Sequence, residues 1–203
     1  MALSKARLAE LAIALFCTNC IQIVKGELQD IDSLSSTVAK CSVIISLLGP
    51  NFSNMNFNPT MYADFYKSLF PLMRQHGVSR IIAMGTLSIR DPEDKWTFFQ
   101  VMVSSIMPLI ANNIYHSVRN LADAFVQEAG DLDWTIFRIA AIPGESDEQS
   151  WKKDRDSGNV LSGWVGEKGW TYSLKRGALA RWLVDVAEGN GNQWIRKMPA
   201  VSN

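Results

Sequence analysis

Residues 42–50 read Ser-Val-Ile-Ile-Ser-Leu-Leu-Gly-Pro, and this stretch decides the fold. Apart from two serines, residues 42–48 are apolar, and Gly49 and Pro50 follow at once. A nearly continuous apolar run of this length is typical of a parallel strand that is buried on both faces of a sheet. Glycine and proline are strong signals for the end of such a strand. The stretch therefore predicts an inner strand of an α/β protein.

The segments on either side alternate between short apolar strands and longer helices. Further strands are predicted at residues 21–24, 80–84, 134–139 and 194–196, with two short strands within 160–174. Helices are predicted at residues 4–15, 32–40, 62–76, 96–107, 112–130 and 176–188, with a break or kink at Pro108 and a polar loop at 143–158. This alternation indicates a single α/β domain over residues 1–203, with a mostly parallel sheet and helices on both faces.

The charges of the chain balance, because 20 Lys and Arg residues face 20 Asp and Glu residues. The balance gives no electrostatic reason to expect nucleic acid or an anionic membrane as a partner. No apolar run reaches the roughly 20 residues that span a bilayer. The first residues lack the basic and apolar regions of a signal peptide. We therefore expect a cytoplasmic protein that binds a small molecule.

The cysteines and acidic residues do not form a recognisable metal or redox site. Cys17 and Cys20 have C-x-x-C spacing, but a second ligand pair is missing, so we interpret them as reduced thiols. Asp91, Glu93 and Asp94 are interpreted as a solvated loop without a metal. The sequence predicts no metal cofactor.

Five segments together resemble the atypical short-chain dehydrogenases/reductases, in particular the NmrA-like, NAD(P)H-binding subgroup. The most marked is Leu-Asp-Trp-Thr-Ile-Phe-Arg at 132–138, which is similar to the subgroup's L-D-W-T-I-x-R-P signature. The other segments lie at residues 24–30, 43–49, 77–82 and 173–183. The resemblance implies a Rossmann-like domain that binds NAD(P). Members of this family reduce small molecules, sense the cofactor, or act in natural-product pathways without net redox change.

The chain departs from the family pattern at its beginning. The glycine-rich loop G-x-G-x-x-G, which lets backbone N–H groups reach the cofactor's diphosphate, occurs nowhere in the sequence. A strand-helix-strand unit of about 40 to 50 residues is expected before the first strand and is not found. The strand at 21–24 must then pair with the strand at 43–48 directly, or elsewhere. The alternative is unpaired strand edges, which favour association between copies of the chain, so we expect a homo-oligomer.

The candidate catalytic residues lie around a Tyr-x-x-x-Arg segment. Tyr115 and Arg119 are one helical turn apart, and the resemblance implies that Arg119 takes the place of the lysine that lowers the tyrosine pKa in family reductases. Ser88 or Thr86, after the strand at 80–84, would orient the carbonyl. His116 is a second candidate acid or base, or else a solvent-facing helix residue. Tyr115 itself is either the proton donor or a packed tyrosine with a surface hydroxyl.

The candidate cofactor-binding residues follow three predicted strands, because ligands bind at the carboxyl ends of strands in open α/β sheets. They are Leu48, Gly49, Pro50 and Asn51 after one strand, Gly85 after the next, and Ile142 and Pro143 after a third. The aromatic and methionine side chains between Trp96 and Met107 are interpreted as core, with a substrate pocket or a subunit interface as alternatives.

Three hypotheses about function follow. The first is an NAD(P)-dependent reductase acting on a small, aromatic or polyketide-like metabolite. The second is a cofactor-free isomerase or cyclase of natural-product biosynthesis, in which Tyr115, His116 or the asparagine-rich loop does acid–base chemistry. The third is a non-catalytic regulatory or binding protein. The missing glycine loop counts against the first.

Overall fold

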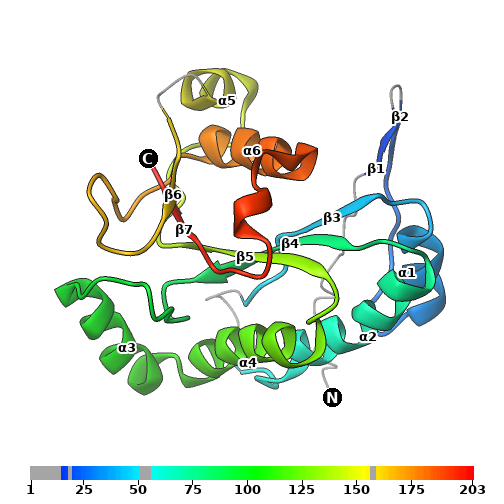
Figure 1. The fold of residues 1–203 in the computed structure, drawn as a ribbon, viewed down its shortest axis with the longest axis horizontal. Helices are drawn as coiled ribbons and strands as arrows, with labels where there is room; N and C mark the ends of the chain where they lie inside the picture. The colour runs from blue at the N-terminus through cyan, green and yellow to red at the C-terminus, as the bar shows by residue number, and fades with distance from the viewer. Residues whose placement is uncertain (1–14, 18–19, 51–55, 156–158) are drawn as a thin grey trace, which may run out of the picture.

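The computed structural model of the chain describes residues 15–17, 20–50, 56–155 and 159–203. Its main sheet has five strands in the order β3-β4-β5-β7-β6 (Figure 1). The strands are β3 (Val43–Ser46), β4 (Arg80–Thr86), β5 (Asp133–Ile139), β7 (Ala200–Ser202) and β6 (Leu161–Gly163). All neighbours run parallel except β6 and β7, which are antiparallel. The predicted mostly parallel Rossmann-like sheet is confirmed.

Helices cover both faces of this sheet (Figure 1). The larger core cluster contains Ile81 and Ala83 of β4 and Trp134 and Ile136 of β5, which pack on one face against α1 (Ile31–Val38), α2 (Met61–Gln75) and α4 (Asn112–Glu128). The smaller cluster contains Ile82 and Phe137, which pack on the other face against α6 (Arg176–Asp185). Because successive side chains of a strand alternate between faces, the apolar runs of β4 and β5 supply both layers.

The helix that carries the candidate tyrosine, α4, is oriented by the packing of its apolar stripe. The buried residues of α4 recur at helical spacing and include Ile114, Val118, Leu121 and Phe125. They pack against α2, where Phe70 meets Phe125 edge to face at 4.9 Å between ring centroids. This packing sets the rotation of α4, so that Tyr115 and Arg119 both line a pocket beside the loop that follows β4.

The first strands differ from the prediction. β1 (Leu15–Cys17) and β2 (Cys20–Gln22) form a separate antiparallel hairpin in which Cys17 lies opposite Cys20. The strand expected at 21–24 therefore does not pair with β3. The predicted helix at 4–15 falls almost entirely outside the described residues, and Leu15 belongs to β1. Among the described residues β3 pairs only with β4, so it forms an edge of the main sheet.

Several other boundaries need correction. The segment 143–158, predicted as loop, contains α5 (Glu148–Arg155), whose charged sequence gives no apolar stripe. The last strand is β7, whereas Trp194 belongs to a 3₁₀ turn, η2 (Asn192–Trp194). A π-helical turn, η1 (Val186–Asn190), continues α6. Within 160–174 the structure has one strand, β6, in place of two.

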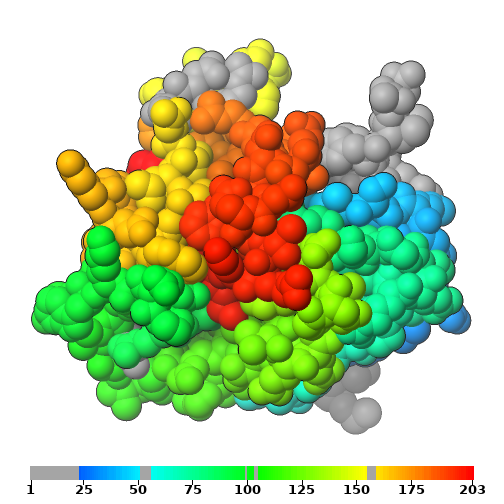
Figure 2. Space-filling view, viewed as in Figure 1, coloured from blue at the N-terminus to red at the C-terminus, as the bar shows by residue number. Residues whose placement is uncertain are grey.

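The helix α3 (Phe98–Ile110) forms one end of the molecule and differs from the prediction in two ways (Figures 1 and 2). It continues through Pro108 to Ile110, although the helix was predicted to end at Met107 with a break or kink at the proline. The apolar side chains between Trp96 and Met107 were interpreted as core, but Trp96, which precedes α3, is 77% exposed, and Phe98 and Met102 are 72% and 37% exposed. None of the described helices is both long and apolar enough to span a bilayer.

Candidate functional site

A pocket of about 540 Å³ lies beside α4, near the carboxyl end of β4. The loop after β4 contributes one wall, α4 contributes another, and single residues come from α3 and from the segment before β7. The lining residues are Ser88, Ile89, Arg90, Ser105, Tyr115, Arg119, Ala122, Asp123, Val126 and Met198. Loops at the carboxyl ends of parallel strands are where ligands bind in folds of this type. The pocket is therefore the candidate active site.

Tyr115 and Arg119 form a direct pair in this pocket. The Arg119 Nη1 donates a hydrogen bond to the Tyr115 hydroxyl over 3.0 Å, and the guanidinium carbon lies 5.4 Å from the centre of the tyrosine ring. The two residues are four apart on α4, so the helix itself brings them together. The hydrogen bond holds the hydroxyl oxygen in place beside a group that stays positively charged. The arrangement can serve acid–base chemistry.

The other predicted catalytic residues lie nearby, with different surroundings. Ser88 is buried and lines the pocket. Thr86 stabilises the turn after β4, because its hydroxyl accepts a hydrogen bond from the Ser88 N–H over 3.3 Å. Thr86 does not line the pocket. His116 is exposed, and its ring contacts the Tyr115 ring edge to face at 5.5 Å between centroids. The structure thus brings together Ser88, Tyr115 and Arg119.

The predicted cofactor-binding residues lie outside this pocket. Leu48, Gly49 and Pro50 follow β3 and are partly buried, and Asn51 falls outside the described residues. Ile142 packs against the core cluster below α6. The Pro143 carbonyl accepts a hydrogen bond from the Arg176 N–H over 3.3 Å. These residues occupy the carboxyl ends of β3 and β5, on either side of the end of β4.

Gly85 is buried near the end of β4, and its surroundings leave no space for a side chain. An added Cβ would lie 2.7 Å from Ile136 Cγ2 and 2.8 Å from Ile89 Cδ1. We expect Gly85→Ala to lower the free energy of unfolding by about 1–3 kcal/mol through overpacking. Gly130→Ala is the matched control, because its Cβ would meet nothing within 4 Å. Urea unfolding of both variants checks this, and equal stabilities would contradict it.

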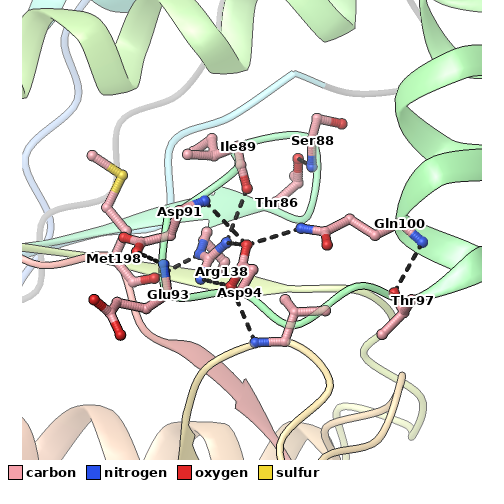
Figure 3. Close-up of polar contacts among 11 residues, drawn as sticks. Thr86, Ser88, Ile89, Asp91, Glu93, Asp94, Thr97, Gln100, Arg138 and Met198 are labelled. Atoms are coloured by element: carbon pink, nitrogen blue, oxygen red, sulfur yellow. Dashed lines mark hydrogen bonds and ion pairs between the residues drawn. The ribbon is translucent and has the colours of Figure 1, made fainter.

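Sequence reasoning missed a buried ion pair that supports the pocket wall (Figure 3). Arg138 of β5 is fully buried and binds both carboxylate oxygens of Asp94, at 2.5 and 2.7 Å. The same guanidinium donates to the Ile89 and Met198 carbonyls, at 3.0 and 2.6 Å. Ile89 and Met198 both line the pocket. The pair therefore ties the loop after β4 and the segment before β7 to the sheet.

Asp94 was interpreted as part of a solvated loop, and this interpretation was wrong. Its side chain is only 5% exposed. It accepts hydrogen bonds from the Asp91 and Val165 N–H groups and from the Gln100 side chain, at 3.0, 3.1 and 2.9 Å (Figure 3). A buried carboxylate with this many donors satisfies its oxygens fully. The available signal was Arg138, a charged residue between the apolar Phe137 and Ile139 of a predicted strand.

The pKa of Asp94 makes the stability of the fold depend on pH. Burial raises this pKa, but the hydrogen bonds and charge of Arg138, with the Asp91 N–H and Gln100, hold it below its ordinary value. A carboxyl group with a lowered folded-state pKa stabilises the fold above its unfolded-state pKa, about 3.9, and loses this contribution as the pH falls through its folded-state value.

We therefore expect the difference in unfolding free energy between wild type and Asp94→Asn to be constant from about pH 5 to 8 and to shrink below about pH 4. Urea unfolding across a pH series checks this. The pKa of Asp131 is also lowered, to about 2, by Arg74. That carboxyl is present in both proteins, so its contribution cancels in the difference. A difference that grows on acidification would contradict the prediction.

The residues of the chain fit one end of NAD(P) better than the other. A tyrosine hydroxyl beside a guanidinium offers hydrogen-bonding partners for the ribose hydroxyls at the nicotinamide end. For the diphosphate, the sequence has no G-x-G-x-x-G, and β3 has no described partner on its outer side. The chemistry of the pocket therefore fits the nicotinamide-ribose end, while a glycine-rich diphosphate cradle is missing from these 203 residues.

Within the described residues, no three His, Cys, Asp or Glu side chains lie close enough to hold a metal.

Comparison with known proteins points to one family. The family model described as NAD(P)H-binding matches residues 7–189 of the chain. No curated protein matches the chain. Several solved structures resemble the chain in fold.

Three such structures, all distant in sequence, show the extent of the likeness. A wide-type short-chain dehydrogenase/reductase from Veillonella parvula, in complex with NADP, is 13% identical with a TM-score of 0.60, over 90% of this chain and 72% of that chain. An oxidoreductase from Lactococcus lactis is 16% identical with a TM-score of 0.60, over 91% and 73%. An anaerobillin reductase from Escherichia coli O157:H7 is 13% identical with a TM-score of 0.57, over 87% and 72%. At these identities the likeness shows the shared fold alone.

Proposed function

The chain belongs to the NAD(P)H-binding family, and from this membership we propose that it is an NAD(P)-dependent reductase of a small carbonyl compound, with the Tyr115 hydroxyl as proton donor. The observation that carries the proposal is the 3.0 Å hydrogen bond between Arg119 and the Tyr115 hydroxyl within the pocket. A hydroxyl held by a cation inside a pocket suits proton transfer to a carbonyl oxygen.

Each pocket residue then has a defined task. Tyr115 donates its proton to the substrate oxygen, and the charge of Arg119 stabilises the tyrosinate that remains. The buried Ser88 hydroxyl donates a hydrogen bond to the same substrate oxygen and orients it. Bound NAD(P)H would supply the hydride to the carbonyl carbon. Ile89 and Met198, held by Arg138, form an apolar wall that excludes water from the substrate.

A second candidate function is a cofactor-free isomerase or cyclase. It is favoured by one observation, the absence of a G-x-G-x-x-G loop from the sequence. The Tyr115 and Arg119 pair would then move protons within a substrate, with no net redox change. The third hypothesis is a non-catalytic binding or regulatory protein, which binds a ligand or a partner without turnover.

Titration of the purified protein with NADPH and NADH, followed by calorimetry, separates these functions. We expect micromolar binding of one of the two, followed by cofactor oxidation when a carbonyl compound is added. No binding at millimolar concentration would contradict the reductase and favour the cofactor-free enzyme. Binding without oxidation across a panel of aldehydes, ketones and oxo acids would favour the regulatory protein.

A further inference from the structure

We propose that the pocket selects a 2-oxo acid, a substrate whose ketone lies next to a carboxylate, and that Arg90 and Arg119 bind this carboxylate. The inference rests on the proposed function, because it places the ketone at Tyr115. It adds the chemical class of the substrate and makes Arg90 a specificity-determining residue.

The first argument is the charge of the pocket lining. Two guanidinium groups, Arg90 and Arg119, line it from two different elements, the loop after β4 and helix α4. Asp123 is the single acidic residue among the lining residues, so the lining carries a net positive charge. Guanidinium groups remain protonated and match carboxylate oxygens with paired N–H donors. A carboxylate is therefore favoured over a neutral ligand.

The second argument is the spacing between the tyrosine and the cation. The Tyr115 hydroxyl and Arg119 Nη1 are 3.0 Å apart. In a 2-oxo acid the ketone and the carboxylate share one carbon–carbon bond, so their oxygens are held at a comparable separation. A guanidinium has five N–H donors, and one of those on Arg119 donates to Tyr115. The ketone oxygen can meet Tyr115 while the carboxylate meets Arg119 and, from the facing loop, Arg90.

The third argument concerns the rest of the substrate. Beyond the arginines, half of the lining residues are apolar, namely Ile89, Ala122, Val126 and Met198. From Tyr115 to Val126 the pocket follows α4 for about 16 Å at 1.5 Å per residue. An apolar body, such as a phenyl group on a short chain, would lie along this stretch. Reduction would convert the ketone to a secondary alcohol, with two electrons and a hydride hydrogen from NAD(P)H and the proton from Tyr115, and would leave the carboxylate unchanged.

Calorimetric titration without cofactor tests the inference through three matched probes. These are 2-oxo-4-phenylbutanoate, its neutral methyl ester, and 4-phenylbutanoate, which lacks the ketone. We expect the oxo acid to bind at least tenfold more tightly than the ester and more tightly than the simple acid. Arg90→Gln and Arg119→Gln should each weaken binding of the oxo acid about tenfold to a hundredfold, because each removes a hydrogen bond to a charged group. Arg90→Gln should leave binding of the ester unchanged, whereas Arg119→Gln should weaken the ester less than the oxo acid, since Arg119 also holds the Tyr115 hydroxyl. Lys168→Gln, an exposed change outside the pocket lining, is the charge control.

The outcomes separate the inference from the function on which it rests. Equal affinity for oxo acid and ester, equal losses for both in the arginine variants, or no binding of either probe would overturn the inference. NADPH oxidation with the ester and with neutral aldehydes, without preference for the acid, would retain the reductase and overturn only the inference. Selective binding of the oxo acid without oxidation of NADPH or NADH would support the binding site and contradict the proposed reductase.

Discussion

Asp94→Asn is expected to lower the free energy of unfolding by about 3–5 kcal/mol, because it leaves the buried Arg138 guanidinium without its counter-charge. Arg138 is fully buried, and Asp94 is its one ion-pair partner among the described residues. A single amide oxygen cannot replace two carboxylate oxygens that receive separate guanidinium nitrogens. The measurement is urea unfolding at neutral pH, followed by tryptophan fluorescence and by circular dichroism.

A second Arg–Asp pair in the same protein provides the control. Arg74 donates to Asp131 through two nitrogens, at 2.7 and 2.6 Å, but both side chains are partly exposed. Exposed pairs contribute little, since water solvates either partner alone. We expect Asp131→Asn to unfold near the wild-type midpoint. Equal effects of the two Asp→Asn changes would contradict the role given to burial.

If Asp94→Asn does not fold, the double variant Asp94→Leu with Arg138→Met still tests the argument. Replacing both charges by apolar groups avoids an uncompensated buried charge. The double variant should therefore be less destabilised than the sum of the two single variants, or should fold when either single variant fails. The rescue is expected to be partial, because the carbonyls of Ile89 and Met198 lose their donor. An additive loss would show that the charges do not interact.

The main sheet was predictable because its strands carry their own signal. The apolar runs of β4 and β5 fill both core layers, and their periodicity needs no knowledge of distant contacts. β7 was missed because only three residues, Ala200–Ser202, form it, and its place depends on pairing with β5 and β6. The hairpin of β1 and β2 was missed because its short strands were read as a helix end and a sheet strand.

The Asp94 and Arg138 pair, which ties the pocket wall to the sheet, was not predicted from the sequence. The two residues are 44 positions apart, and the Asp-Pro-Glu-Asp segment has the composition of an exposed turn. Only the fold shows that this loop returns beneath β5. The Tyr115 and Arg119 pair, in contrast, follows from helical spacing alone, because residues four apart share a face. Arg90 was missed for the same reason as Asp94, since a loop arginine has no periodic pattern.

Tyr115→Phe is expected to lower kcat for carbonyl reduction by about a hundredfold to ten-thousandfold, the range that a positioned proton donor contributes. The change removes one oxygen and keeps the ring that packs beside His116 and beneath Arg119. Cofactor affinity should fall by about tenfold at most, because the change removes one neutral hydrogen bond to the ribose and keeps Arg119.

The measurement is single-turnover oxidation of NADPH, or of NADH if that cofactor binds, with cofactor affinity determined separately by calorimetry. Tyr172→Phe is the matched control, since Tyr172 is exposed, packs against Trp170 and does not line the pocket. A kcat equal to that of wild type in Tyr115→Phe would remove the tyrosine from the mechanism. A loss of kcat much larger than the loss of cofactor affinity would separate proton donation from binding. A loss that disappears when the substrate carries its own acidic proton beside the carbonyl would identify the missing step as proton transfer.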